Sequence, residues 1–475
     1  MISSYPVNFF AVALMAAWVP LIFVLFVLMP ARRAVIAAFV VGYLFLPEIK
    51  FIVHTLPPID KVTLTAFGVI LGSLFFDGGR LFAVRPRWID VPIVVLCLSP
   101  IITSILNDLG FMDGLANCFT LLFRWGLAYW IGRAYFTDWE STRELVLGIV
   151  LGGLAYAPLC WWEIRMSPQL HGQIYGLLFL SFRTDRNIFG WRPNVFLANS
   201  LSVTMFMGIS ALIAFWAWMT GSPKRLLGVP MGWIALLLIV TAVFCKAMGG
   251  IVLMSAGITA LMMTRWPATK AAVLCLIVAA PLYILLRTSG DWSGERLVEI
   301  AGWVNPERGK SLDFRLQNEN LLAEKALRRM WFGFGGFGRA QVWDDYGHLL
   351  TVVDGLWIIT FGEYGLVGLG ALLLFVLVPA MMMWYRVPTR YWLDAACAAP
   401  VALAVAITLY MIDSLFNATF NPIASLAVGA VGSMYSAATA VFSPGIVRRF
   451  PPAAAAAPVV SSVKDVPYAY PAYRS

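Results

Sequence analysis

Charged side chains are scarce in this chain of 475 residues. Only 12% of the residues are charged, whereas an average soluble domain carries about 25%. Hydrophobic residues make up 60% of the chain, and the mean hydropathy is +0.80. This composition excludes a soluble globular body and predicts a polytopic membrane protein built from apolar helices.

Metal-binding and disulfide-forming residues are also few. The three histidines, His54, His171 and His348, lack the spacing of a metal site, so we expect neither a metal nor another cofactor. The six cysteines lie in or beside apolar runs without a CxxC pair, which indicates buried free thiols. The net charge of +9 reflects loop charges that set topology, and no nucleic-acid partner is expected. No basic segment precedes the first apolar run, so we expect no cleavable signal peptide.

The apolar runs predict an all-α fold with about thirteen membrane helices, and about twelve to fourteen are compatible with the pattern. The predicted spans lie near residues 7–29, 33–53, 61–76, 90–107, 114–136, 144–162, 194–219, 229–245, 249–264, 268–287, 353–384, 393–414 and 421–443.

Basic residues in alternating short loops predict the orientation. They are Arg32/Arg33, Arg80/Arg85/Arg87, Arg143, Lys224/Arg225, Arg265/Lys270, Arg386/Arg390 and Arg448/Arg449. The positive-inside rule places these loops in the cytoplasm and the N-terminus outside. A transmembrane domain over residues 1–443 then carries two long extracytoplasmic loops, 163–193 and 288–352. The Pro/Ala-rich segment 444–475 is expected to be a disordered cytoplasmic tail.

The first long loop carries three arginines just before a predicted span, namely Arg183, Arg186 and Arg192. Guanidinium groups match phosphate oxygens with a rigid fork of donors, so the cluster suits a diphosphate. A solvated loop with interfacial arginines is the alternative. Lys246, beside Gly249–Gly250 on the same predicted side, lines the same cavity or extends to the membrane surface.

The second long loop predicts an amphipathic helix over the membrane body, capped by Ser311 or Asp313. Two ion pairs at i,i+4 spacing are expected on it, Arg315–Glu319 and Glu324–Arg328. Its apolar face is expected to consist of Leu316, Leu321, Leu322, Ala326 and Met330.

Glycines follow this helix in the sequence WFGFGGFG, residues 331–338. Gly333, Gly335 and Gly338 form a GxGxxG pattern, but no strand precedes it and no βαβ unit surrounds it. We therefore predict a tight turn and not a dinucleotide site.

Asp354 opens the apolar run 353–384, where an ionisable group is costly and usually functional. It could orient or deprotonate a hydroxyl group, and an exposed loop aspartate is the alternative. Gly365, Gly368 and Gly370 follow, and they permit a close helix contact or a helix break.

Together these residues resemble the family of O-antigen ligases and O-antigen/exopolysaccharide polymerases. Arg315 matches the arginine of the family's loop helix, and residues 331–338 match its glycine turn without the usual proline. Asp354–Gly355, nine residues and Gly365-Leu-Val-Gly368 match its last element in spacing. Residues 186–194 and CKAMGG, residues 245–250, are similar to two earlier family segments. The resemblance covers roughly residues 170–440.

The resemblance implies a membrane-embedded transferase of the GT-C type in the bacterial inner membrane. Its donor would be a glycan on undecaprenyl diphosphate, and its acceptor would be another glycan or the lipid A core. Chain-length or export proteins are further implied partners. Arg186, Arg192 and Arg315 would stabilise the departing diphosphate without a metal, Arg183 and Lys246 would assist, and Asp354 would act on the acceptor hydroxyl. Glu319 is a second candidate base.

One departure bears on the reaction. Ligases of the family place histidine where this chain has Asp354, and aspartate there is more similar to polymerase-type members. Polymerisation is therefore the first prediction, and en bloc ligation is the second. Peptidoglycan polymerisation, a lipid-linked glycan transporter and a purely structural membrane subunit stay open as alternatives.

Overall fold

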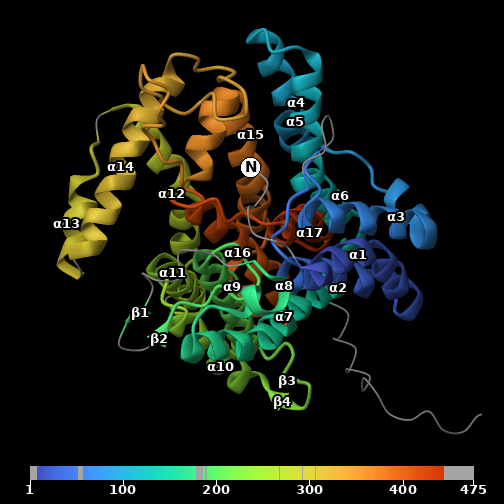
Figure 1. Cartoon of the computed structure of the whole chain (residues 1–475). Coiled ribbons are helices and arrows are strands. Elements are labelled where there is room, and N and C mark those ends of the chain that lie inside the picture. The colour runs from blue at the N-terminus through green and yellow to red at the C-terminus, as the bar shows by residue number, and fades with distance from the viewer. Residues whose placement is uncertain are drawn as a thin grey trace, which may run out of the picture.

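The fold is seen in a computed structural model, which describes residues 8–51, 57–177, 186–187, 190–266, 268–290, 292–304 and 306–442. Within these residues the chain is a bundle of helices with two very short hairpins (Figure 1). The two antiparallel hairpins are formed by β1 (Arg186–Asn187) with β2 (Gly190–Trp191) and by β3 (Arg225–Leu226) with β4 (Val229–Pro230).

The helices follow one another in a simple order. They are α1 (Phe9–Leu28), α2 (Ala31–Phe45), α3 (Lys61–Phe82), α4 (Val91–Leu106), α5 (Phe111–Leu121), α6 (Leu127–Tyr135), α7 (Trp139–Met166), α8 (Leu170–Tyr175), α9 (Ser200–Thr220), α10 (Met231–Phe244), α11 (Met248–Arg265), α12 (Ala271–Thr288), α13 (Glu295–Val304), α14 (Pro306–Leu327), α15 (Leu356–Arg386), α16 (Ala398–Asp413) and α17 (Pro422–Phe442). Short 3-10 turns lie at Trp88–Asp90 and Thr389–Tyr391, and a π-helical turn at Leu122–Gly126 joins α5 to α6.

Within the described residues, eight helices are long and apolar enough to cross a membrane, and the protein is a multi-pass membrane protein. Three shorter apolar helices, Met231–Phe244, Ala398–Asp413 and Pro422–Tyr435, add to them. α16 is buried along nearly its whole length, because it is apolar on every side and neighbouring helices cover it (Figure 1). The total of about thirteen spans stays a prediction, since α2 and the α5–α6 segment fall outside both groups.

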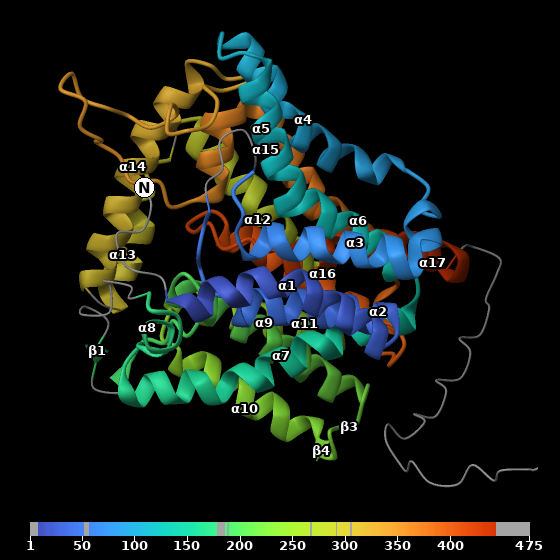
Figure 2. The ribbon, with the colours of Figure 1, turned by 45° about the vertical axis from the view of Figure 1, so that its right-hand side comes forward.

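The bundle has two ends that carry different elements. At one end the start of α15 meets the loop after α16, since Leu356 N–H donates to Asn417 O at 3.4 Å. We call this the site end. The opposite end contains the β3–β4 hairpin, whereas α8, β1, α13 and α14 lie on the other side of the molecule (Figure 2). The hairpin with Lys224 and Arg225 therefore lies apart from the described parts of the two long loops, and the sides of the membrane stay a prediction.

Several predicted boundaries were wrong. α2 ends at Phe45 and not near residue 53, because Pro47 lies just beyond its end. α3 runs on to Phe82, six residues past the predicted end, and has a kink at Asp77. α14 begins at Pro306, ahead of the predicted caps at Ser311 and Asp313, because proline is well suited to the first turn of a helix.

Candidate active site at the start of α15

The start of α15 is held tightly against the loop after α16. A Cβ atom on Gly355 would lie 2.3 Å from Leu415 O, so only glycine allows this approach. Trp357 N–H donates to Ser414 O at 3.3 Å in the same contact. Asp354 therefore has a fixed position at the site end, where α14, α15 and residues 414–417 meet.

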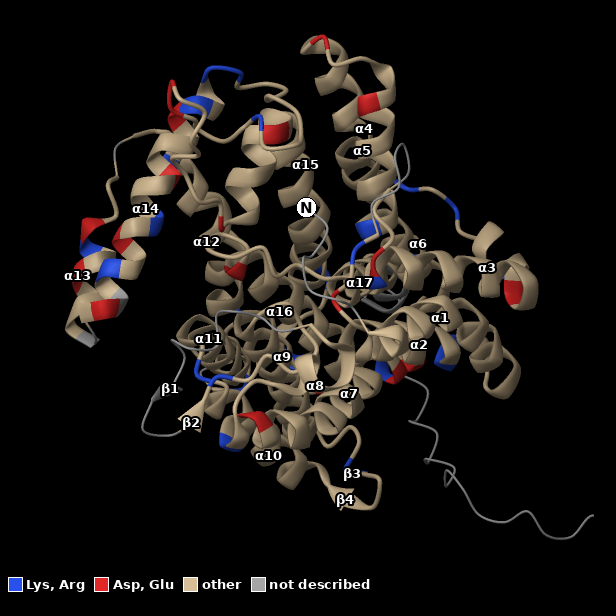
Figure 3. Ribbon diagram, in the orientation of Figure 1, with Lys and Arg blue, Asp and Glu red and all other residues tan. Residues whose placement is uncertain are grey.

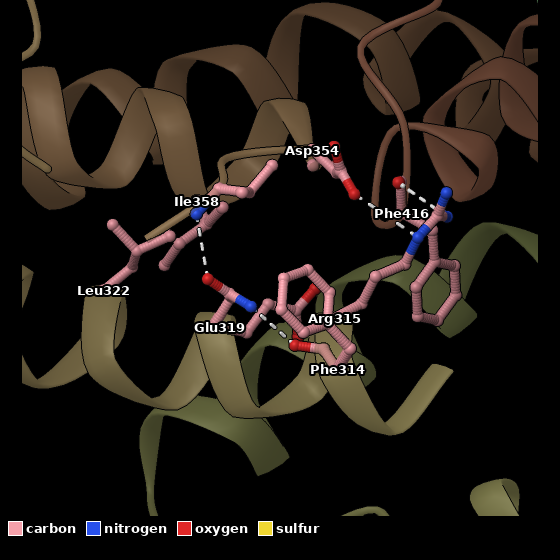
Figure 4. Close-up of a pocket in the computed structure, with 10 residues that line it drawn as sticks. Phe314, Arg315, Glu319, Leu322, Asp354, Ile358 and Phe416 are labelled. Atoms are coloured by element: carbon pink, nitrogen blue, oxygen red, sulfur yellow. Dashed lines mark hydrogen bonds and ion pairs between the residues drawn. The ribbon is translucent and has the colours of Figure 1, made fainter. Parts of the chain in front are cut away.

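Arg315 on α14 faces Asp354 directly. Its Nε lies 3.3 Å from Asp354 Oδ2, and the side chains are 29% and 40% exposed. Arg315 Nη1 also donates to Phe416 O at 3.3 Å and to Asn417 Oδ1 at 3.4 Å. Figure 4 shows the guanidinium between the carboxylate and Phe416. The pair is ordered by its partners, yet it remains open to a ligand.

A small recess of about 10 Å³ lies beside this pair (Figure 4). Its walls come from α14, from residues 352–358 and from Phe416. Asn318 Oδ1 accepts from Val352 N–H at 2.8 Å, so α14 also holds the segment that leads into Asp354. One predicted arginine and two predicted carboxylates, Arg315, Asp354 and Glu319, thus line one recess.

A buried polar chain supports Arg315 from behind. Asn417, which accepts from Arg315, donates through Nδ2 to Asp413 Oδ1 at 2.9 Å. Thr419 donates to the other oxygen of Asp413. Asn417 and Asp413 were not predicted as site residues, because nothing in the local pattern distinguishes them from ordinary helix-end residues.

Glu319 lies in different surroundings from Asp354. It is buried, and its carboxylate lies 3.4 Å from Arg287 Nε and accepts from Tyr283 OH at 2.7 Å and Trp357 Nε1 at 3.4 Å. Burial raises the pKa of Glu319 above its ordinary value, although these donors oppose the shift. The predicted Arg315–Glu319 pair is wrong, because each side chain has a partner on another segment. The predicted Glu324–Arg328 pair is confirmed at 3.0 Å.

Glu319 lies on the buried face of α14. The residues of that face differ in part from the predicted ones. Leu316, Leu322 and Ala326 are buried as predicted, but Leu321 is 46% exposed. Arg287 fixes the face to α12 through Nη2, which donates to Leu316 O at 2.9 Å. Glu319 therefore joins α14 to the bundle, and Asp354 is the more accessible carboxylate of the recess.

The predicted diphosphate-binding residues lie away from the recess or outside the described part. The recess lining does not include Arg192 or Lys246. Lys246 Nζ donates to Trp191 O at 3.3 Å, and burial, with a contribution from nearby Arg192, lowers the pKa of Lys246. Arg183 lies outside the described residues, and only the backbone of Arg186 is described, in β1.

The predicted glycine turn is confirmed. Gly333, Gly335 and Gly338 all have positive φ, between 66° and 83°. The turn is joined to a break in α15 at Gly365, where φ is 64°. Phe334 and Gly335 donate to Gly362 O and Glu363 O, both at 2.9 Å, and Leu366 donates to Met330 O at 2.7 Å. The turn thus satisfies the backbone groups that the broken helix leaves free.

Charge is concentrated close to this region. Figure 3 shows acidic and basic residues on α13 and α14 and at helix ends, whereas the central helices carry few. Within the residues that the structure describes, no three histidine, cysteine, aspartate or glutamate side chains come together as a possible metal site. The metal-independent chemistry suggested by the sequence stays a prediction.

Comparisons with known proteins do not assign this chain to a family. No protein-family model matches it, and no curated protein matches it significantly. The arrangement presents an accessible cation and an accessible carboxylate side by side, which suits an anionic leaving group and a hydroxyl nucleophile.

Proposed function

We propose that this protein polymerises surface-polysaccharide repeat units, O-antigen or exopolysaccharide, carried on undecaprenyl diphosphate. The observation that carries the proposal is the accessible Arg315–Asp354 pair in the recess at the site end. The proposed location is the bacterial inner membrane, with the site end outside and the opposite end in the cytoplasm. The proposed fold class is that of the GT-C membrane glycosyltransferases.

The proposed step is a single displacement at the anomeric carbon of the donor. The acceptor hydroxyl oxygen forms a bond to this carbon while the bond from the carbon to the diphosphate oxygen breaks. The hydroxyl proton passes to the Asp354 carboxylate, and the electron pair leaves with the polyprenyl diphosphate. Attack from the face opposite the leaving group inverts the anomeric configuration.

Arg315 would stabilise the charge that develops on the diphosphate. A guanidinium donates through a planar fork, so it replaces a metal ion in this role and does so without a bound cofactor. Arg315 Nε and Nη1 hold Asp354, Phe416 and Asn417 in the structure described here. Binding of the donor would therefore exchange part of this set for phosphate oxygens and release the carboxylate toward the acceptor.

The roof over the recess supports a transferase over a hydrolase. α14 lies across the start of α15 and contributes Phe314 and Leu322 to the lining. With a donor bound, these two apolar side chains would limit the access of water to it.

The test compares two substitutions in purified protein supplied with a lipid-linked repeat unit. Asp354→Asn and Arg315→Lys should each lower polymer formation at least about a hundredfold, because a positioned base or a charged fork is lost. The matched controls are Asp345→Asn and Arg328→Lys, which change exposed residues of the same region outside the recess lining. Near-normal polymer from Asp354→Asn would contradict the proposed role of this carboxylate.

The glycan of a deletion strain separates the proposed reaction from its nearest rivals. Loss of long polymer, with single repeat units still attached to the acceptor, supports polymerisation. Complete polymer held on its lipid carrier would instead identify en bloc ligation to the lipid A core or another acceptor. An unchanged glycan would contradict both reactions and favour a transporter or a structural subunit.

A further inference from the structure

A second and larger hollow lies at the end opposite the proposed active site. This groove of about 820 Å³ runs between the last turns of α9 and the first turns of α10, beside the β3–β4 hairpin. Its lining includes Phe215, Trp218, Met231, Trp233, Leu236 and Ile239. The recess at Arg315 is about 10 Å³, so the two hollows differ greatly in size as well as in place.

The walls of the groove suit a hydrocarbon chain. α9 is long and apolar enough to cross a membrane, and α10 is a shorter apolar helix. The groove extends along α10 from Met231 to Ile239, roughly 12 Å of helix at 1.5 Å per residue. Trp218 and Trp233 are 50% and 66% exposed, and tryptophan is characteristic of the membrane–water boundary.

The backbone at the head of the groove is fixed. β3 and β4 pair Arg225 with Pro230, and Met231 N–H donates to Lys224 O at 3.0 Å. Gly232 allows Trp218 to lie close to α10, since a Cβ atom there would be 2.9 Å from the indole nitrogen. The backbone of Lys224 and Arg225 therefore has a fixed position at the end of the apolar groove.

The charge at the head of the groove has one sign. Lys224 lines the groove, and Arg225 follows it in β3 (Figure 3). The sequence contains no aspartate or glutamate between residues 186 and 290, so no neighbour along α9–α12 neutralises them. α7 also packs against α10, but its acids at that end are engaged: Glu140 pairs with Arg143, and Glu144 with Arg32 and Arg33.

We propose that this groove binds an anionic phospholipid of the bilayer. One acyl chain lies between α9 and α10, the indoles of Trp218 and Trp233 flank the glycerol region, and Lys224 and Arg225 hold the phosphate. A phosphate monoanion complements the two cations, whereas a zwitterionic headgroup brings its own positive charge to them. The site is independent of the proposed glycosyl transfer, since it lies at the other end of the bundle.

Basic loops also set the topology of membrane proteins. If Lys224 and Arg225 act only in that way, the expected result differs from that of a lipid-binding site. A topology signal acts through charge alone and gives the folded protein no preference among bound lipids. A lipid-binding site requires basic residues next to an apolar groove. The preference for an anionic lipid therefore depends on where the basic residues lie.

The test measures lipid binding to the purified full-length chain in a neutral detergent by native mass spectrometry. The probes are phosphatidylglycerol and phosphatidylcholine with identical acyl chains. Wild type should bind phosphatidylglycerol more tightly, and Lys224→Gln and Arg225→Gln should each lower its affinity about fivefold, the usual contribution of one basic residue near an anionic headgroup. Leu236→Asn, at an exposed groove position, should weaken both lipids alike.

Arg265→Gln is the matched control, because Arg265 is an exposed cation at the end of α11 that does not line the groove. It should leave the preference intact. Equal binding of the two lipids to wild type, or an equal loss in Arg265→Gln and Lys224→Gln, would overturn the proposal. Displacement of phosphatidylglycerol by lower concentrations of a polyprenyl phosphate would overturn the assignment of the occupant.

Discussion

Glu319 and Asp354 are two carboxylates of one recess, but their partners assign them different tasks. Asp354 has one charged partner and 40% exposure, whereas Glu319 is buried with three donors around it. A base must reach the proton that it removes, and the donors of Glu319 leave little room for an acceptor hydroxyl. We therefore assign Glu319 to the support of α14 and keep Asp354 as the proposed base.

Glu319→Gln tests this division. It leaves Arg287 buried beside a neutral amide, and removal of one partner of a buried ion pair costs about 3–5 kcal/mol. We expect a lower unfolding temperature, together with activity that survives below that temperature. Asp354→Asn should show the reverse, a near-normal unfolding temperature without polymer formation. An unchanged unfolding temperature with complete loss of turnover in Glu319→Gln would assign the base to Glu319.

His171 predicts a pH dependence of stability. It is buried in α8, where Nε2 accepts from Glu48 N–H at 3.2 Å and Nδ1 lies 3.3 Å from Leu177 O. Burial lowers the pKa of His171 to about 4. The unfolded chain binds this proton near pH 6.5, so stability is complete above that pH and falls as the pH drops toward 4.

The loss should reach about 2–3 kcal/mol near pH 4. Unfolding temperatures measured between pH 7 and pH 4 in wild type and in His171→Gln check it, since glutamine keeps an acceptor for Glu48 N–H but does not titrate. His348 offers the matched control, because it is 77% exposed. His348→Gln should keep the wild-type slope, and a slope that persists in His171→Gln would contradict the assignment.

The sequence pattern predicted only some of the residues that form the candidate site. Arg315 and Asp354 were recognisable, because a charged residue beside an apolar run is unusual in any sequence. Arg287, Tyr283 and Asn417 were not, because their roles depend on contacts with residues 29 to 102 positions away. Such distances follow from the packing of whole helices, which no local pattern encodes.

At the level of the elements, α15 is the helix that links the site to the rest of the bundle. Its break at Gly365 is filled by residues 330–335, which donate and accept where the helix cannot. The sequence indicated that the glycines allow a break or a close contact. It could not choose between them, because the partner is the backbone of a segment some thirty residues earlier.

Gly365→Ala tests the break. The new Cβ atom would lie 2.3 Å from Trp331 C, and φ at this position is 64°, which alanine rarely adopts. We expect a loss of more than about 2 kcal/mol in stability, from strain and from displacement of the turn. Gly370→Ala is the matched control in the same helix, because nothing lies within 4 Å of its Cβ position. It should be neutral or stabilising by about 0.5–1 kcal/mol, and an equal result in the two variants would contradict the strain at Gly365.

At the scale of the whole molecule, the two ends of the bundle carry different features. The site end carries the amphipathic helix α14 and the glycine turn, and the opposite end carries the β3–β4 hairpin (Figure 2). The alternation of sides predicted from the basic loops stays a prediction. The number of crossings was harder to predict, since helices such as α2 are shorter than their apolar runs.

Single cysteines should report the two sides of the membrane. Phe337→Cys near the site end and Leu227→Cys in the hairpin are suitable, because the native side chains are 73% and 78% exposed. In a Cys275→Ser background, which removes an exposed native thiol, we expect a membrane-impermeant maleimide to label residue 337 in intact spheroplasts. Residue 227 should react only after lysis. Labelling of both residues in intact spheroplasts would contradict the assignment of sides.

The break in α15 also has a consequence for how the protein enters the membrane during synthesis. The segment before Gly365 begins at Leu356 and rises only about 13 Å, less than half of a hydrocarbon core of about 30 Å. The segment after it, to Arg386, is long enough to be retained by the bilayer as it leaves the translocon. Residues 330–335 are synthesised shortly before this first segment. The backbone hydrogen bonds at its end form only when residues 330–335 dock against it. The start of α15 is thus completed only by this docking, and a variant that cannot form the glycine turn would insert into the membrane with an incomplete site end.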